Sequence, residues 1–567
     1  MKTENSKQDC QFKQIADLLC QDWDVLVIGG GITGAGILLE AARRGWKVLL
    51  IEQKDFAWGT SSRSSKLVHG GLRYMQQGKF GLTLDSVHER QRLLESVAGL
   101  VDPQSFAFGD YKGRKPGRWL FSFGLAIYDW MASRQGQKQA HRYHRAQDFL
   151  MLAPHIERRN LLGGLCYQDA KTDDARLVFR VLQEASANAG EALNYVRADH
   201  ILYRDGVAYG ASLIDARNKR RYDVQAKIII NATGAWADKL SWQYASRQVH
   251  EQLPAQADKQ ADKQAQRQAA PHKLRPLRGS HLLLPAWRLP VAQAVSFMHP
   301  RDGRPVFAYP WEGVSLIGTT DVDHHTDLQT EVSITVEEVD YLMEALDFQF
   351  PQLQIRWGDV ISCYAGVRPV IDSGKTDPSK EGRDHAIWLE KGLLTVTGGK
   401  LTTFRLIALD VMKQITPLLP ALASGIDDGH LFKPADDLSG DVRLDHARRT
   451  RLQGHYGTLA AAVLAAAREG ELEYLPGTLT MWVELRWAAR SEAVLHLEDL
   501  LLRRTRIGLL LRHGGLALLP RIRLICQPEL QWDDAHWELE QASYLQLWNR
   551  YHALPGDLIH DSQAALA

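Results

Sequence analysis

Cysteine and long apolar runs are the two things this sequence has least of. The 567 residues contain five cysteines, an odd number, widely spaced and without a C-x-x-C pair: Cys10, Cys20, Cys166, Cys363 and Cys526. This spacing argues against a disulfide framework or a structural zinc site, and it indicates free thiols in a reducing compartment. No uncharged apolar run approaches the roughly 20 residues that a membrane-spanning helix needs. The polar residues 1–10 lack the apolar centre of a signal peptide. We therefore expect a cytoplasmic-side protein without a transmembrane helix or a metal centre.

An excess of charge of one sign is also missing. Lys and Arg number 68 against 67 Asp and Glu, which leaves a net charge of +1. Such a balance gives no electrostatic argument for nucleic acid as a partner. Hydrophobic residues at 45% and charged residues at 24% are ordinary for globular proteins. The length is sufficient for roughly two to four domains with a sizeable core.

The most informative stretch is residues 24–36. Val25–Ile28 predicts a short buried strand, and Gly29, Gly31 and Gly34 form a G-x-G-x-x-G turn before an apolar, helix-like segment. The first glycine makes the tight turn, the second lets a pyrophosphate approach the backbone, and the third lets the helix pack on the strand. A second predicted strand ends at Glu52, whose carboxylate can accept hydrogen bonds from a ribose. The pattern predicts a dinucleotide-binding unit.

The segment 60–74 interleaves serines and glycines with basic and apolar residues. A solvated Ser-rich loop is the simpler interpretation. The alternative is a functional loop that offers hydroxyls, backbone N–H groups and positive charge, because an ordinary linker would not interleave apolar and basic residues so tightly.

Thr60–Tyr74, with the sequence TSSRSSKLVHGGLRY, resembles the second signature of the FAD-dependent glycerol-3-phosphate dehydrogenases, which belong to the D-amino-acid-oxidase-like flavoprotein superfamily. Ile28–Gly36 resembles the first signature. Further matches follow in order at Asp173–Leu177, Asn231–Trp236, Gly279–His281, Ile317–Asp321, Gly366–Pro369, Ser379–His385 and Thr397–Arg405. The resemblance implies a mixed α/β fold, with a Rossmann-like FAD-binding domain, an antiparallel-sheet substrate domain and a helical C-terminal domain.

The expected domain organisation is interleaved. Its parts are a polar leader (1–22), an FAD-binding domain within 23–435 (about 23–100, 161–240 and 365–420), a substrate domain (about 101–160 and 275–364), a low-complexity surface insertion (243–273) and a helical domain (436–567). Within the helical domain, we interpret the basic run Arg503–Arg506 as a solvated helix face.

The resemblance also assigns the cofactor and its binding residues. The cofactor is FAD, which we expect to be held non-covalently. The residues expected to bind it are Gly29, Gly31, Gly34, Glu52, Thr60, Ser61, Ser62, Ser64, Ser65, Lys66, His69, Gly70, Gly234, Gly398, Gly399, Lys400, Leu401 and Thr402. Arg63 departs from the family pattern, because a small residue is common there, and its bulk is expected to affect the flavin environment.

Three cations next to small residues, Arg73, Arg368 and Lys400, are predicted to converge on a pocket at the flavin. Buried together they favour a di-anion such as a phosphorylated or carboxylated small alcohol. The resemblance narrows this to sn-glycerol 3-phosphate, oxidised at C2 to dihydroxyacetone phosphate. It implies that Arg73, Tyr74, Arg368 and Lys400 bind the substrate, with Arg368 and Lys400 also in the catalytic set.

The proton acceptor is less well defined. His281 is the candidate base, because histidine titrates near working pH. His69 is the rival.

The electron acceptor is left open by the sequence. The resemblance favours a dehydrogenase that passes electrons to a membrane quinone. The alternatives are an oxidase that reduces oxygen to peroxide and a related FAD-dependent oxidoreductase of another small anionic substrate. A non-catalytic nucleotide-binding protein or RNA-modifying scaffold is a further hypothesis, which the cation set and the balanced charge disfavour.

Residues 112–128 join a basic cluster to an aromatic apolar run, which suits a membrane surface; a buried helix behind a solvated loop is the alternative. We expect peripheral association with the inner face of the membrane, and a homodimer is compatible with the resemblance.

Overall fold

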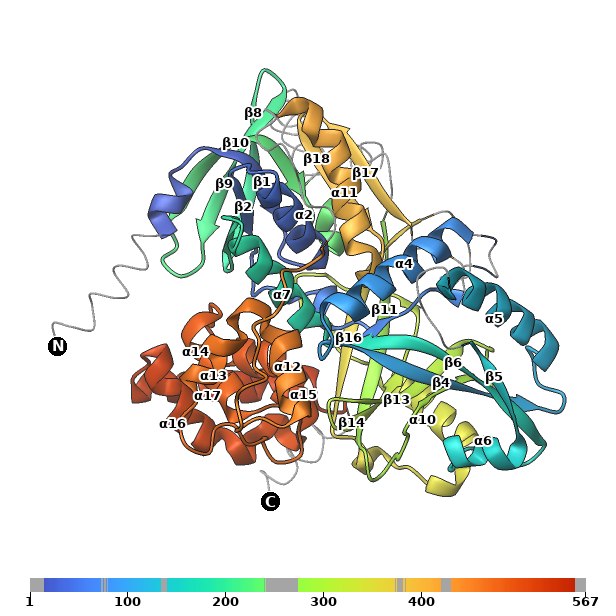
Figure 1. Cartoon of the computed structure of the whole chain (residues 1–567). Helices are drawn as coiled ribbons and strands as arrows, with labels where there is room; N and C mark the ends of the chain where they lie inside the picture. The colour runs from blue at the N-terminus through green and yellow to red at the C-terminus, as the bar shows by residue number, and fades with distance from the viewer. Residues whose placement is uncertain are drawn as a thin grey trace, which may run out of the picture.

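Among the residues that it describes, the computed structural model contains two β-sheets and a C-terminal group of helices (Figure 1). It describes residues 15–555 except 73–74, 76–77, 79, 134–139, 239, 241–273, 373, 375–380, 383 and 420–429. The predicted insertion 243–273 and most of the predicted leader lie outside the described residues. The interleaved domain boundaries stay a prediction.

The first sheet carries the predicted dinucleotide-binding unit. Its strand order is β17 (His385–Glu390), β18 (Leu393–Gly398), β10 (Arg221–Asn231), β1 (Trp23–Ile28), β2 (Val48–Ile51) and β7 (Glu191–Leu193). The five strands from β18 to β7 pair in parallel, whereas β17 is antiparallel to β18. Strands β8 (Val196–Arg204) and β9 (Val207–Asp215) form a hairpin, and β9 pairs antiparallel with β10. Because the core strands run in parallel, their carboxyl ends lie at one edge of the sheet.

The parallel strands are buried because helices pack on them. Val25–Val27 of β1 and all four residues of β2 are buried, as the unbroken apolar runs predict. Helix α2 (Ile32–Arg43) packs against α7 (Asp174–Ser186) and α11 (Phe404–Ile415). A Cβ atom on Gly36 would lie 2.9 Å from the Phe404 ring, so this glycine permits the close approach of α2 to α11.

The second sheet has ten strands, and all its pairings are antiparallel except that of β4 with β12. Its strands are β3 (Leu67–Val68), β4 (Val101–Tyr111), β5 (Arg142–Arg145), β6 (Leu161–Thr172), β11 (Leu274–Pro285), β12 (Ala294–Met298), β13 (Pro305–Trp311), β14 (Val314–Gly318), β15 (Val322–Asp323) and β16 (Ser362–Ile371). Helix α10 (Val336–Gln349) begins with a capping box formed by Thr335 and Glu338 and packs against β11.

Helices α4, α5 and α6 lie beside the second sheet. Helix α4 (Phe80–Ser96) runs between α11 and α5 (Arg118–Ser133), and α5 lies at the edge of the molecule opposite the C-terminal helices (Figure 1). Helix α6 (Ala146–Leu152) packs against β6.

The C-terminal part is helical, as predicted. It contains α12 (His446–Tyr456), α13 (Ala460–Ala466), α14 (Trp482–Ser491), a π-helix (Asp499–Arg504), α15 (Ile507–Leu510), α16 (Leu519–Leu530) and α17 (Asp534–Tyr551). Its apolar side joins a core cluster with residues of the second sheet, including Tyr309, Trp311 and Tyr364. The helices therefore pack on the second sheet and share its core.

The interpretation of Arg503–Arg506 as a solvated helix face is wrong. Arg503, Arg504 and Arg506 are all buried, with relative exposures of 2%, 3% and 2%. Arg503 and Arg504 pair with Asp55, and Arg506 pairs with Asp173 and Asp174. The sequence of a basic run does not show whether carboxylates from distant parts of the chain will pair with it and bury it.

No helix among the described residues is long and apolar enough to cross a membrane.

Candidate functional site

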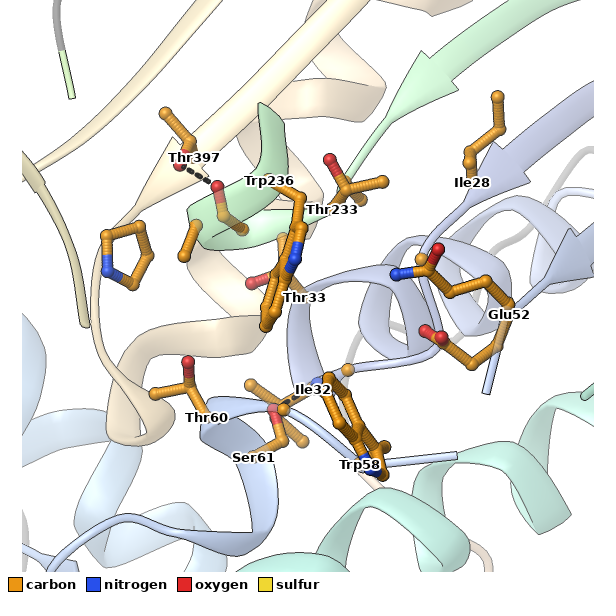
Figure 2. A pocket seen from close by; sticks show the side chains of 18 of the residues that line it. Ile28, Ile32, Thr33, Glu52, Trp58, Thr60, Ser61, Thr233, Trp236 and Thr397 are labelled. Carbon is orange, nitrogen blue, oxygen red and sulfur yellow. Dashed lines mark hydrogen bonds between the residues drawn. The ribbon is translucent and has the colours of Figure 1, made fainter. Parts of the chain in front are cut away.

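A cavity of about 530 Å³ opens at the carboxyl edge of the first sheet (Figure 2). It is bounded by the turns that follow β1, β2, β10 and β18 and by the start of β8. Its volume falls in the range of pockets that bind cofactor-sized ligands. The cavity thus occupies the position at which open parallel sheets bind nucleotides.

The glycine turn after β1 forms one wall. Gly29 has φ +119°, and a Cβ atom there would lie 2.6 Å from the carbonyl oxygen of Ala232. A Cβ atom on Gly34 would lie 1.9 Å from the carbonyl oxygen of Gly29, so only glycine lets α2 begin this close to the strand. Gly31 is the N-cap of α2 and lines the cavity. The helix therefore presents its N-terminus to the cavity, as an anion site requires.

Glu52 closes the cavity at the end of β2. Its Oε2 accepts a hydrogen bond from the Gly30 amide (2.7 Å), and its Oε1 accepts one from the Lys54 amide (3.0 Å). Burial raises the pKa of Glu52, while these amide donors act to lower it. A carboxylate can accept about four hydrogen bonds in all, which is more than these amides use. The carboxylate is thus held in place with acceptor capacity for a ribose diol.

The other end of the cavity is formed by the turns after β10 and β18. Thr397 Oγ1 donates to the Gly234 carbonyl (3.0 Å), which ties the two turns together (Figure 2). Gly234 has φ +60°, and a Cβ atom there would meet no atom within 4 Å, so this glycine borders open space. Gly398, Gly399, Lys400 and Leu401 complete this wall.

Part of the serine loop faces the cavity. Thr60, Ser61 and Ser64 line it, and Ser61 Oγ accepts a hydrogen bond from the Ile32 amide at 3.0 Å. Seven residues that the resemblance assigned to cofactor binding do not line the cavity: Gly34, Ser62, Ser65, Lys66, His69, Gly70 and Thr402. Lys66 is fully buried and its ammonium donates to Asp174 Oδ1 at 2.9 Å. Burial lowers the pKa of Lys66 to about 8, with a further contribution from Arg506, against the opposing effect of Asp174.

The structure places His281 beside this loop. His281, on β11, is 1% exposed and stacks on Tyr364 with ring centroids 4.7 Å apart. Its Nε2 is hydrogen-bonded to Ser65 Oγ at 2.9 Å, and no hydrogen-bond partner of Nδ1 is found among the described residues. Burial, Arg368 and Lys66 hold the pKa of His281 well below 6.5, so the ring is neutral at neutral pH. Neither His281 nor Arg368 is a lining residue of the cavity.

The two described cations of the predicted set have defined partners. Arg368, on β16, donates from Nη1 to Asp321 Oδ1 (2.9 Å) and from Nη2 to Thr319 Oγ1 (3.1 Å), and its neighbour Pro369 lines the cavity. Lys400 lines the cavity, and its Nζ donates to Ser86 Oγ on α4 at 2.7 Å. The third predicted cation, Arg73, and its neighbour Tyr74 lie outside the described residues. The binding and catalytic roles of all these residues stay predictions.

Arg63 acts on the cavity through a neighbour. It forms an ion pair with Glu331, and its guanidinium lies 5.2 Å from the ring centre of Trp58, which lines the cavity. Trp58 in turn contacts Trp236 with ring centroids 5.8 Å apart (Figure 2).

Sequence reasoning missed several lining residues. Trp58 and Trp236 stand within or beside recognised motifs, and two aromatic residues flanking glycine turns were an available signal. Val196–Asp199 and the pair Leu328 and Gln329 also line the cavity. These two segments carry no local pattern, because only the tertiary fold brings them to the sheet edge.

The residues present fit the FAD that the resemblance implies. The cavity has a helix N-terminus for a pyrophosphate, a fixed carboxylate for a ribose and a glycine with open space in front of it. Among the described residues, no cluster of His, Cys, Asp and Glu suits a metal ion.

Comparison with known proteins extends this result. A family model described as FAD dependent oxidoreductase matches residues 24–405, and one described as the C-terminal domain of alpha-glycerophosphate oxidase matches residues 425–537. An aerobic glycerol-3-phosphate dehydrogenase of Staphylococcus epidermidis is 34% identical over 530 residues, covering 89% of this chain and 90% of that protein. A Staphylococcus aureus protein of the same name is 32% identical over 514 residues, covering 85% and 86%.

Two solved structures are also similar. The glycerol-3-phosphate dehydrogenase from Bacillus halodurans complexed with FAD superposes with a TM-score of 0.69 at 28% identity, covering 94% of this chain and 97% of that one. The L-alpha-glycerophosphate oxidase from Mycoplasma pneumoniae with FAD bound gives 0.52 at 18% identity, covering 70% and 95%. The second likeness concerns the fold alone.

The glycine turn generates a direct prediction. Gly34→Ala forces the turn apart, because its Cβ would overlap the Gly29 carbonyl, and we expect the purified protein to lose most of its flavin. Gly81→Ala on α4 is the control, since its Cβ meets nothing within 4 Å; it should keep full flavin content and gain up to about 1 kcal/mol of stability. Flavin-to-protein ratio and thermal unfolding measure both effects. Equal flavin content in the two variants would contradict the assigned role of the turn.

Proposed function

The chain belongs to the FAD-dependent oxidoreductase family and, within it, to the aerobic glycerol-3-phosphate dehydrogenases, and from this premise we propose that it oxidises sn-glycerol 3-phosphate at C2 to dihydroxyacetone phosphate. The observation that carries the proposal is the dinucleotide cavity with Lys400 in its wall, in a chain similar to these dehydrogenases over most of its length. Bound FAD supplies the two-electron acceptor for the C2 hydride.

Arg368 is the proposed phosphate ligand. Its guanidinium is oriented by Asp321 and Thr319 through Nη1 and Nη2, next to Pro369 at the cavity wall. A guanidinium held in this way binds a phosphate with little further loss of side-chain freedom. Lys400 is the second proposed anion ligand, and Arg73 and Tyr74 are proposed from the family pattern.

His281 is the proposed acceptor of the C2 hydroxyl proton. When Nε2–H donates to Ser65 Oγ, the lone pair of the neutral ring is at Nδ1, and this atom can take a proton. The lowered pKa keeps the ring in the neutral form that a base requires at neutral pH.

The electron acceptor is a separate part of the proposal. We favour a membrane quinone, in keeping with relatives that are named dehydrogenases. Oxygen is the second candidate, because the C-terminal region matches a domain named after an oxidase. Turnover with a quinone analogue, compared with peroxide formation in air, separates the two acceptors.

Peripheral membrane association through α5 belongs to the same proposal. One side of the helix is buried at Leu125 and Tyr128. Trp119, Leu120, Phe123 and Trp130 are exposed by 80%, 72%, 67% and 55%. The exposed basic residues Lys112, Lys115 and Arg118 lie beside them. Aromatic side chains at the headgroup level with adjacent cations are typical of proteins that bind an anionic membrane surface.

A cytoplasmic location at the inner face of the membrane, and a homodimer, remain proposals.

The first prediction concerns the phosphate. Arg368→Ala should lower kcat/KM for glycerol 3-phosphate at least about tenfold, because a charge-assisted contact is worth roughly 1.5–3 kcal/mol. The residual rate with plain glycerol should hardly change, since glycerol has no phosphate. Stopped-flow reduction of the bound flavin measures both rates. An equal loss with the two substrates would mean that Arg368 has another role.

The second prediction concerns the base. His281→Gln should lower the flavin reduction rate by about 10²–10⁴ with little change in substrate affinity. Because the folded-state pKa lies well below 6.5, titration of His281 should cause no loss of rate between about pH 8 and pH 6.5. The lowered pKa also affects stability. As the pH falls below 6.5, the unfolded chain binds a proton at His281 before the folded protein does, so the free energy of unfolding should decrease. A near-wild-type reduction rate in His281→Gln would transfer the role to His69 or water.

The third prediction concerns the membrane. Trp119→Ser together with Phe123→Ser should weaken co-sedimentation with anionic vesicles about tenfold or more, because burying each aromatic side chain contributes roughly 1.5–3 kcal/mol. Trp287→Ser is the control, since Trp287 is 78% exposed in the connection between β11 and β12 and is not part of α5. Binding should also fall with salt, as each basic residue near an anionic surface contributes about 1 kcal/mol. Unchanged binding of the double variant would rule out α5 as the contact.

A further inference from the structure

We propose that Arg506, in the C-terminal helical domain, is a positioning residue for the loop 60–66 at the FAD cavity, and that this domain therefore helps to build the cofactor site. The inference rests on the cavity binding FAD and does not depend on the identity of the substrate.

The loop 60–66 needs partners from elsewhere. It contains one short 3₁₀ turn, Thr60–Ser62, and precedes the two-residue strand β3, so regular secondary structure satisfies few of its backbone groups. The Ser64 carbonyl accepts from Tyr364 OH (2.8 Å), and the Ser65 carbonyl accepts from Tyr309 OH. The Ser62 carbonyl accepts from Lys66 Nζ (2.9 Å) and from Arg506 Nη1 (3.2 Å).

Arg506 also holds the carboxylates that bind the loop. Asp174 Oδ2 accepts from the Ser64 amide (2.9 Å) and hydroxyl (2.7 Å), while its Oδ1 accepts from Lys66 Nζ and from Arg506 Nη2. Arg506 Nε donates to Asp173 Oδ1 at 3.0 Å. All three nitrogens of the guanidinium thus contact the loop or the two aspartates at the start of α7.

Burial makes this cluster sensitive to the loss of one member. Lys66 and Asp174 are fully buried, and Arg506 and Asp173 are 2% and 5% exposed. Two cations face two carboxylates, and removing a cation leaves buried negative charge without its partner. Arg506 also has a left-handed backbone (φ 60°, ψ 5°), which a non-glycine residue keeps only where its surroundings fix it.

The loop connects this cluster to the site. Ser64 lines the cavity, and Ser65 Oγ is hydrogen-bonded to His281 Nε2 at 2.9 Å. Arg504, two residues before Arg506, also holds a loop near the cavity. Its Nη1 and Nη2 donate to Asp55, in the loop that follows Glu52, at 2.5 and 2.8 Å. The segment 499–506 thus holds two of the loops that shape the cavity.

The test compares Arg506→Met with Arg451→Met. Arg451 is the matched control, because it is also an arginine of the C-terminal domain that pairs with two carboxylates, Glu484 (2.9 Å) and Glu312 (2.7 Å) in the turn between β13 and β14, and none of its hydrogen bonds goes to the loop. We expect Arg506→Met to weaken FAD binding about tenfold or more, to change the visible circular dichroism of the bound flavin, and to speed amide hydrogen exchange in residues 60–70 of both apo-protein and holoenzyme. Arg451→Met should lower the unfolding temperature without these three effects.

Arg506→Lys keeps the positive charge but loses the planar guanidinium that donates from three nitrogens. This variant replaces Arg506→Met in the test if Arg506→Met does not fold. It should shift all three measurements in the same direction by a smaller amount. The proposal is overturned if Arg506→Lys matches the wild type in all three, or if Arg451→Met changes them as much as Arg506→Met. FAD affinity and hydrogen exchange need no substrate, so a failure here is distinct from a failure of the proposed reaction.

Discussion

The parallel pairing of β18, β10, β1, β2 and β7 is the constraint on which the rest of the structure depends. It brings the carboxyl ends of these strands to one edge, where their backbone must turn away and leaves polar groups free for a ligand. Glycine is required where those turns approach one another, at Gly29 and Gly34. Glu52 is fixed at the same edge by two backbone amides. The cavity is thus a consequence of strand direction together with a few small residues.

Buried charge connects this edge to the rest of the molecule. Asp55 belongs to a loop of the first sheet, and its carboxylate pairs with Arg503 and Arg504 of the C-terminal domain. Burial by itself would raise the pKa of Asp55, and the two arginines lower it to about 2. Such pairs contribute less to stability than their number suggests, because desolvation opposes the attraction. These pairs do favour one placement of the C-terminal domain relative to the loops, because any other placement would leave a buried charge without a partner.

The sequence contains the information for the local elements near the glycine turn. The apolar run of β1, the glycine spacing and the terminal acid of β2 were sufficient to predict a strand, a helix and a second strand where they occur. The membership of the FAD-dependent family also followed from ordered motifs. Long-range partners were not predictable: the burial of Arg503–Arg506 depends on Asp55, Asp173 and Asp174, which lie more than 300 residues away. Val196–Asp199 reaches the cavity because β8 follows directly on β7, which pairs with β2, and because the Val196 amide donates to the Glu52 carbonyl at 2.8 Å.

The central claim is that the cavity holds a flavin that sn-glycerol 3-phosphate reduces. Anaerobic titration of the purified holoenzyme with this substrate tests it most directly, with glycerol as the control and dihydroxyacetone phosphate measured at each step. The account predicts that the yellow absorbance of the oxidised flavin bleaches, with one dihydroxyacetone phosphate formed for each flavin reduced, and that glycerol at the same concentration leaves it almost unchanged. The account would be contradicted if dithionite bleached the bound flavin but glycerol 3-phosphate did not.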